Sequence, residues 1–267
     1  MKFCFITNDL SAAKWADGIV DRVMIDLEFI GKSDRQTGKN LFQSEHTIGD
    51  VSRIKSVLFE SKLMVRINSV HQNTVAEINE VIERGADIVM LPYFKSAEEI
   101  ELFVSCTNKR VRTSLLIETK EAVSVLPKII EYADVDEYHI GLNDLALSLH
   151  KENIFHTILD GDVQHCVQIL QHTKKPYGFG GISSLSSHDL PINPILFLSE
   201  QVRSGCSIGW LGRSFRSSIH SEHDMRREVA KLREAISQLS ALDMDSNHDK
   251  LMTAISGYSA SVKPYRI

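Results

Sequence analysis

Polar side chains gather at the ends of several short apolar segments of this sequence. Six residues share this position: Asp26, Glu28, Arg66, Asn68, Glu118 and Asp144. Carboxylates bind divalent cations, and a guanidinium binds a carboxylate or an enolate oxygen, so together these groups can hold an oxygen-rich anion beside a metal ion. Their chemistry depends on whether the fold brings them together.

The spacing of these residues assigns them to one face of each predicted strand. Side chains two residues apart in a strand share a face. Arg66 and Asn68 therefore share the face of Met64, and Glu118 shares the face of Leu116. Strands on a surface would alternate throughout, and purely structural buried strands would remain apolar. The pattern indicates a polar site at the C-terminal ends of the strands.

The chain as a whole alternates short apolar segments with amphipathic ones. Eight strands are predicted at residues 2–7, 22–28, 63–68, 87–93, 112–119, 137–143, 176–183 and 207–214, each followed by a helical segment. This alternation favours a single-domain α/β fold, a (β/α)₈ TIM barrel over residues 1–240. An open, doubly wound sheet is the alternative. Residues 241–267 are expected to be a C-terminal tail that packs on the barrel or reaches a neighbouring subunit as an oligomer arm.

Composition excludes several classes of protein. The 267 residues are 43% hydrophobic and 24% charged, which suits a globular chain with one sizeable core. A net charge of −5 argues against nucleic acid or an anionic membrane as partner. No apolar run reaches membrane-spanning length and none resembles a signal peptide, so a cytoplasmic location is expected. The four cysteines are far apart and predict free thiols, neither a zinc site nor disulfides.

In a barrel, the six polar residues would converge on one mouth. Several carboxylates facing one arginine repel one another unless a cation lies among them, so a bound Mg²⁺ or Mn²⁺ is expected. Two plainer interpretations give similar patterns. Buried ion pairs would hold a barrel together without a metal, and Asn143 or Asp144 would simply cap the following helix.

Five segments of the chain resemble one known family in their order and distances. The segments are VMIDLE, LMVRIN, RGADIVMLPYFKSAEEIE, SLLIETKEAV and YHIGLNDLALSL, and they span roughly residues 23–150. They resemble the HpcH/HpaI aldolase and citrate lyase β-subunit family of metal-dependent barrels. The resemblance implies a carbon–carbon lyase or aldolase that acts through the enolate of a pyruvate-like 2-oxoacid, or on a related acyl unit. It also implies a homo-oligomer, a trimer or hexamer.

The resemblance also implies roles for individual residues. Glu118 and Asp144 match the family's two metal ligands, and Arg66 matches the arginine that binds the carboxylate or enolate oxygen of the 2-oxoacid. Asp26 and Glu28 are expected to contact the metal through a bound water molecule or to contact its ligands. Asp26 is also expected to be a catalytic residue.

Glu28 is also expected to bind substrate, and so are three further residues. Asn68 supports Arg66, while Lys32 and Arg35 face the other half of the substrate.

The sequence departs from the aldolase branch after the second strand. Phe29 stands where that branch has a histidine used in acid/base chemistry, and the acidic residues that follow DLE in the citrate lyase branch are missing. His46, just before a helix predicted to open at Thr47, is the candidate replacement, because histidine is the commonest general base. The alternative is a solvated loop histidine. His139, inside a strand, is interpreted as structural.

A second candidate site lies in the segments GFGGISS and GWLGRSF. Glycines such as Gly181, at the ends of the last two strands, allow a phosphate to approach the backbone closely, and Arg213 would add charge. Such a site would indicate a phosphorylated or CoA-linked substrate. Alternatively, Gly180, Gly181 and Gly212 serve only to allow tight turns.

Two rival functions remain open. One is a phosphosugar isomerase or synthase that uses the glycine segments as its main site. The other is a barrel that binds a metabolite or a partner protein without catalysis.

Overall fold

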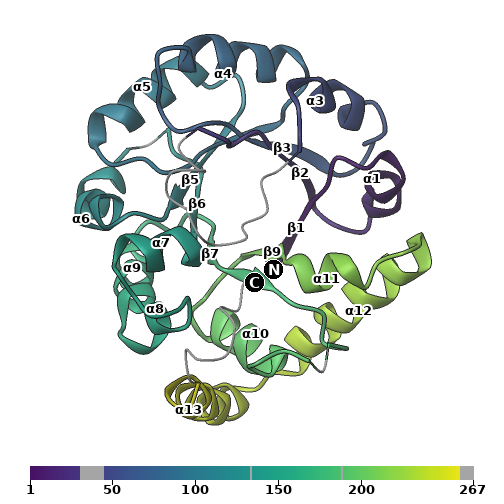
Figure 1. The fold of residues 1–267 in the computed structure, drawn as a ribbon, viewed down its shortest axis with the longest axis vertical. Helices are drawn as coiled ribbons and strands as arrows, with labels where there is room; N and C mark the ends of the chain where they lie inside the picture. Colours follow the sequence, from purple (N-terminus) through teal and green to yellow (C-terminus); the bar gives the residue numbers. More distant parts are fainter. Residues whose placement is uncertain (31–44, 133, 188, 259–267) are drawn as a thin grey trace.

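A computed structural model describes residues 1–30, 45–132, 134–187 and 189–258. Parallel strands form a ring, and helices surround it (Figure 1). The strands are β1 (Lys2–Ile6), β2 (Arg22–Asp26), β3 (Lys62–Arg66), β4 (Ile88–Leu91), β5 (Arg112–Ile117), β6 (Glu137–Ile140), β7 (Tyr177–Phe179), β8 (Gly181–Ile182) and β9 (Ile208–Leu211). Their order in the sheet is β7-β6-β5-β4-β3-β2-β1-β9-β8. The (β/α)₈ barrel prediction is confirmed.

The barrel closes through the seventh predicted strand, which is divided into β7 and β8. β7 pairs with β6 and β8 pairs with β9, so the two ends of the sheet belong to one continuous piece of chain. Gly180 separates them with a φ of +57°, a left-handed conformation that favours glycine. A Cβ at Gly180 would lie 2.8 Å from Leu142 Cδ1. The bend explains why one predicted strand appears as two, and the pairing of β7 with β6 and of β8 with β9 rules out the open sheet.

The helices cover the outside of the barrel. They are α1 (Leu10–Ala16), α3 (Ile48–Lys55), α4 (Thr74–Glu83), α5 (Ala97–Thr107), α6 (Lys120–Ile129), α7 (Leu142–Ser148), α8 (His156–Leu159), α9 (Asp162–Gln171), α10 (Pro194–Arg203), α11 (Arg213–Ser217), α12 (Glu222–Gln238) and α13 (Ala241–Ser256). Local sequence sets several starts: Thr47 forms a capping box with Asp50, and the Ser96 side chain accepts the N–H of Glu99. The helical segment expected after the sixth strand is three helices, α7 to α9.

The barrel interior confirms the predicted parity of the strands. Its apolar centre consists of side chains of one parity in each strand: Cys4, Met24, Met64, Ile88, Met90 and Leu116. The opposite parity packs under the helices in a second, larger core. Because the interior is filled at mid-height, polar residues further along the same faces can reach only the C-terminal mouth.

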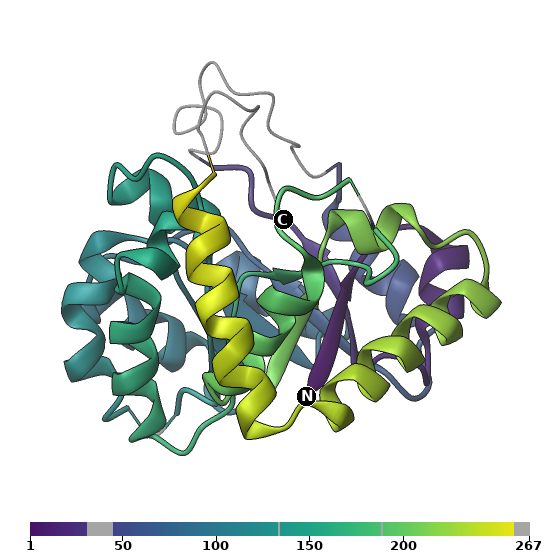
Figure 2. The ribbon, with the colours of Figure 1, turned by 90° about the horizontal axis from the view of Figure 1, so that it is seen from below.

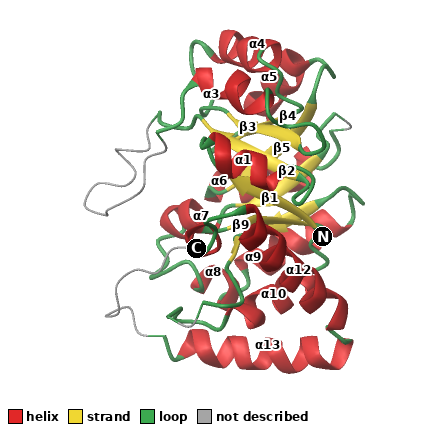
Figure 3. Cartoon of the chain, turned by 90° about the vertical axis from the view of Figure 1, so that its right-hand side faces the viewer, coloured by secondary structure: helices red, strands yellow, loops and turns green. Residues whose placement is uncertain are grey.

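The C-terminal helix α13 lies along the outside of the barrel against α10, as Figures 2 and 3 show. Leu251 and Ile255 on its inner side are fully buried. His248 Nδ1 lies 2.8 Å from Glu200 Oε2, which adds a polar contact to α10. This part of the predicted tail therefore packs on its own barrel, while residues 259–267 lie outside the described residues.

All four cysteines are free thiols, as predicted. None of the described helices combines the length and apolar character needed to cross a bilayer.

Candidate functional site

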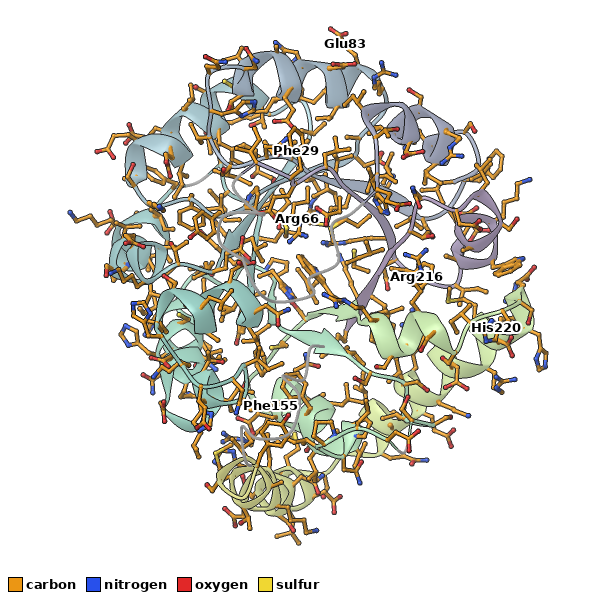
Figure 4. All side chains as sticks on the ribbon, viewed as in Figure 1. Phe29, Arg66, Glu83, Phe155, Arg216 and His220 are labelled. Carbon is orange, nitrogen blue, oxygen red and sulfur yellow. The ribbon has the colours of Figure 1, made fainter. Side chains whose placement is uncertain are left out.

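The C-terminal ends of the strands surround a cavity of about 200 Å³. Seven of the residues predicted to act in catalysis or to bind metal or substrate line it: Asp26, His46, Arg66, Glu118, Asp144, Gly181 and Arg213. Figure 4 shows Arg66 inside the ring of strands, whereas Glu83 and His220 project from the periphery. The fold therefore brings together residues that are up to 187 positions apart in the chain, from Asp26 to Arg213.

Arg66, at the end of β3, is held by two carboxylates from the end of β2. Its Nε and Nη2 donate to the two oxygens of Asp26 at 2.8 and 2.6 Å, and Nη1 lies 3.4 Å from Glu28 Oε2. Burial opposes the charge on Arg66, but Asp26 and Glu28 outweigh burial and raise its pKa well above the usual value. Arg66 is thus a fixed cation, with N–H groups beyond the two that Asp26 takes.

Glu118 follows β5 directly and is almost fully buried, with 2% of its surface exposed. The backbone N–H of Tyr93 donates to its Oε1 at 3.1 Å. Its other oxygen lies against Gly141, where a Cβ would come within 2.7 Å of Glu118 Oε2. The absence of a side chain at Gly141, after β6, therefore gives the Glu118 carboxylate its position.

Asp144 lies in the first turn of α7 and lines the same cavity. The helix begins at Leu142 with Gly141 as its N-cap, and no side chain makes the capping hydrogen bond. The capping interpretation of Asn143 and Asp144 is therefore wrong, because both residues are already inside the helix. Only 7% of Asp144 is exposed, although a carboxylate is costly to bury.

Glu118 and Asp144 fit a divalent cation. Both are hard oxygen donors from neighbouring elements, and both line one cavity. Among the described residues, no group of three or more His, Cys, Asp or Glu side chains is arranged to hold a metal ion. A two-carboxylate site suits Mg²⁺ or Mn²⁺, which complete their coordination with water and substrate oxygens, better than Zn²⁺.

His46 lies beside Asp26, while Phe29 does not occupy the site. The backbone N–H of Asp26 donates to His46 Nδ1 at 2.9 Å, and the imidazole lines the cavity. Burial lowers the pKa of His46, outweighing the opposite effects of Asp26 and Asp50. Because Nδ1 accepts a backbone N–H, the neutral ring carries its proton on Nε2. Phe29 is 65% exposed.

Two predicted residues support the cavity without lining it. Glu28 contacts Arg66, as described above. Asn68 Oδ1 accepts the backbone N–H groups of Phe29 and Ile30, each at 3.0 Å, and its Nδ2 donates to Glu77 Oε1 at 2.7 Å. Asn68 therefore fixes the start of the loop after β2. Lys32 and Arg35 lie outside the described residues.

The glycine segments open into this same cavity. Gly180, Gly181, Gly212 and Arg213 all line it, so the second candidate site is part of the first. The turn interpretation accounts for Gly180, whose positive φ and close contacts require glycine. Gly212 has a φ of −74°, which other residues adopt readily.

Three lining residues were missed or undervalued in the sequence. His139 stacks on Trp210 with ring centroids 4.1 Å apart, and its Nε2 donates to the Gly180 carbonyl at 2.9 Å. Burial lowers the pKa of His139 to about 3, so its ring is neutral and forms part of the cavity wall. Strand parity identifies His139 and Trp210, because both side chains have the parity that points into the barrel. Arg216 follows Arg213 by three positions on α11, a helical spacing that also brings it to the cavity.

The fold and this cavity define an α/β barrel protein with an acidic and arginine-containing site at the C-terminal mouth. The family model for HpcH/HpaI aldolase/citrate lyase matches residues 1–189. The chain belongs to this family, which supports an enzyme of the lyase or aldolase type. The predicted family resemblance is confirmed. No curated protein sequence matches the chain.

Solved structures share the fold at low sequence identity. An HpcH/HpaI aldolase/citrate lyase family protein from Burkholderia cenocepacia J2315 is 15% identical, with a TM-score of 0.62 and coverage of 87% of this chain and 94% of that one. RipC from Yersinia pestis is 15% identical, with a TM-score of 0.60 and coverage of 91% and 98%. The 3-hexulose-6-phosphate synthase from Salmonella typhimurium is 11% identical, with a TM-score of 0.61 and coverage of 89% and 99%.

Proposed function

We propose that the protein is a divalent-metal-dependent carbon–carbon lyase or aldolase that acts through the enolate of a pyruvate-like 2-oxoacid or a related acyl unit. The observation that carries this proposal is the position of Glu118 and Asp144 in one small cavity with the fixed cation Arg66. Family membership adds the reaction class.

Glu118 and Asp144 are the proposed ligands of Mg²⁺ or Mn²⁺. A divalent cation bound there supplies positive charge that stabilises an enolate. The protein fixes the position of the Glu118 carboxylate, because the N–H of Tyr93 donates to it and Gly141, which has no side chain, leaves room for it. Little reorganisation is then needed when charge develops on the substrate.

Arg66 is the proposed binding group for the carboxylate or enolate oxygen of the 2-oxoacid. Asp26 binds the edge of its guanidinium formed by Nε and Nη2, and Glu28 lies beside the third nitrogen, so the direction of the guanidinium is set before substrate binds. Asp26 thus acts on the reaction through Arg66, and Asn68 acts by holding the loop after β2. A guanidinium positioned in this way favours a planar oxyanion.

His46 replaces the absent aldolase histidine in this proposal, but with a different role. Its Nδ1 is occupied by the Asp26 N–H, so the neutral ring presents Nε2–H and is a donor, not a base. In the direction of bond formation, this N–H stabilises the acceptor carbonyl oxygen as it gains negative charge. In cleavage, the hydroxyl on that carbon must first lose its proton to a base other than this N–H group, and His46 then stabilises the alkoxide that remains while the carbon–carbon bond breaks.

The remaining substrate contacts follow from the shape of the cavity. Its volume of about 200 Å³ is below the roughly 300–1,000 Å³ of drug-sized pockets, so we propose small-molecule substrates. Gly181 and Arg213 would bind the part of the substrate beyond the reacting carbons, and Lys32 and Arg35 stay candidates for the same task. The proposed enzyme is cytoplasmic and a homo-oligomer, a trimer or hexamer, with neither nucleic acid nor membrane as partner.

Exchange of the methyl protons of pyruvate in D₂O, followed by NMR, tests this function. The wild type should catalyse exchange only with added Mg²⁺ or Mn²⁺, and Glu118→Gln and Asp144→Asn should abolish it. Glu131→Gln, at an exposed position, is the matched control and should behave as wild type.

The same experiment separates the rival functions. A phosphosugar enzyme would not need Glu118, and a barrel that only binds metabolites would show no exchange. Exchange that survives in Glu118→Gln contradicts the proposal. A metal-loaded wild type without exchange contradicts its 2-oxoacid form and favours an acyl-thioester substrate or a barrel that only binds.

A further inference from the structure

The N-terminal end of the barrel, opposite the candidate active site, contains a second cavity of about 1020 Å³. Its basic lining residues are Lys2, Arg22, Lys62, Lys109, Arg110 and Arg112. Its acidic lining residues are Asp21, Glu60, Asp87, Asp134 and Asp136. The ligand that such a cavity suits depends on which of these charges already have partners.

Three of the cations occupy equivalent positions in the barrel. Lys2, Lys62 and Arg112 are the first residues of β1, β3 and β5. Each has the parity of the inward-facing side chains, and in an eight-stranded barrel such residues from alternate strands form one layer around the axis. Three positive charges are therefore placed around a common opening.

Three aspartates of the lining are held at the rim by the backbone. Each precedes an even-numbered strand and accepts, at 2.8 Å, the N–H of the second residue of the preceding odd-numbered strand: Asp21 from Phe3, Asp87 from Leu63 and Asp136 from Thr113. Two of these aspartates also face cations on the surrounding helices: Asp87 lies 2.6 Å from Lys55, and Asp21 lies 3.4 Å from Arg233.

The two other carboxylates lie in loops. Asp134 lies 3.1 Å from Lys109, and Glu60 packs against Gly18 in the turn after α1. The aspartate carboxylates are thus engaged by the backbone or by cations other than the three at the strand starts.

The three cations themselves lack matching carboxylates. Within the described part of the chain, Lys2 and Lys62 form no ion pair, and Arg112 has only Glu137, at 3.9 Å. Glu137 is already bound through both oxygens by Arg22, in an ion pair buried just inside the layer. The layer therefore carries more positive charge than its carboxylates neutralise, and the like charges around one opening repel one another.

We propose that this N-terminal cavity binds a small multivalent anion through Lys2, Lys62 and Arg112. The shared chemistry is a cluster of anionic oxygens, as in a polyphosphate or a polycarboxylate. Anionic oxygens bound among the three cations would reduce the repulsion between them. Arg112 adds a planar guanidinium that can bind a phosphate or a carboxylate through two hydrogen bonds. The site is independent of the proposed lyase activity, because it lies at the other end of the barrel.

Calorimetric titration with pyrophosphate and with citrate, in metal-free buffer, tests this site. Sodium chloride at matched ionic strength corrects for screening. We expect saturable binding of at least one of the two anions, and the tighter one identifies phosphate or carboxylate as the preferred group. Lys62→Gln should weaken binding about tenfold or more, and Lys62→Arg should restore it. Lys250→Gln, an exposed lysine on α13, should leave it unchanged.

Three results would overturn the proposal. The first is no binding beyond the effect of sodium chloride, and the second is equal affinity in wild type and in Lys62→Gln. The third is binding that persists in Lys62→Gln but disappears in Arg216→Gln, because this would place the anion at the C-terminal mouth. A thermal melt of each variant confirms that the exposed substitution at Lys62 leaves the fold intact.

Discussion

Replacing Gly141 with alanine should displace the Glu118 carboxylate while leaving the fold in place. The backbone at Gly141 has φ −87° and ψ 100°, a region open to any residue, so alanine introduces no backbone strain. The new Cβ would lie 2.7 Å from Glu118 Oε2 and 3.1 Å from its Cβ, whereas ordinary contacts begin at 3.4 Å. The carboxylate must therefore move by several tenths of an ångström.

This displacement determines the size of the expected effect. A misplacement approaching 1 Å costs about 10²-fold in rate, and disturbing the support of a metal ligand costs about 10- to 100-fold in affinity. We therefore expect Gly141→Ala to lower metal-dependent exchange of pyruvate protons about 10- to 100-fold. The free energy of unfolding should change by no more than about 1–2 kcal/mol, since one methyl group is added at the edge of a cavity.

The assay compares Gly141→Ala with wild type and with Gly49→Ala. Gly49 lies in α3, where the nearest atom to a new Cβ is Thr47 Oγ1 at 3.6 Å, so this control adds the same methyl group without a clash. Exchange is measured by NMR over a range of Mn²⁺ concentrations, and stability by chemical denaturation. Wild-type exchange and wild-type Mn²⁺ dependence in Gly141→Ala would show that the position of the Glu118 carboxylate does not matter for activity.

Three further predictions concern the residues around the cavity. Asp26→Asn leaves the buried guanidinium of Arg66 without its main partner and should lower the free energy of unfolding by roughly 3 kcal/mol. The control, Glu80→Gln in an exposed ion pair, should lower it by less than about 1 kcal/mol. Equal losses of the two variants in chemical denaturation would show that burial does not strengthen the Asp26–Arg66 pair. The pKa of His139 is lowered from 6.5 to about 3, so the stability that it contributes is present above pH 6.5 and is lost as the pH falls toward 3. His139→Gln should therefore reduce the slope of unfolding free energy against pH by about 1.4 kcal/mol per unit between those values, and an unchanged slope would show that His139 does not stay neutral. His46→Ala should lower condensation of pyruvate with acetaldehyde about 10²-fold while proton exchange of pyruvate alone changes little; equal losses in both reactions would mean that His46 acts on the enolate.

Much of the site could be predicted from the sequence because strand parity and barrel geometry are local rules. Glu118 follows an apolar strand with the parity of Leu116, and the structure places Leu116 in the barrel interior and Glu118 at the mouth. From the sequence, His139 is interpreted as structural and Trp210 is not singled out, although both line the cavity. Parity gives the face of a side chain, but it does not distinguish a cavity wall from a packed interior.

Other features depend on contacts that no local pattern contains. The role of Gly141 follows from its distance to Glu118 on the neighbouring strand, and the break at Gly180 follows from packing against Leu142. The donor role of His46 depends on a hydrogen bond to the backbone of Asp26, 20 residues away. Such contacts follow from the closure of the barrel, which periodicity predicts without giving distances.

Binding of Mn²⁺, followed by electron paramagnetic resonance with and without pyruvate, tests whether Glu118 and Asp144 form a metal site beside the substrate. We expect about one Mn²⁺ per chain. Glu118→Gln and Asp144→Asn should each weaken binding about tenfold or more, and pyruvate should tighten it in the wild type. Wild-type affinity in both variants, or Mn²⁺ binding that pyruvate does not change, would show that Glu118 and Asp144 do not form the metal site of an enolate-forming enzyme.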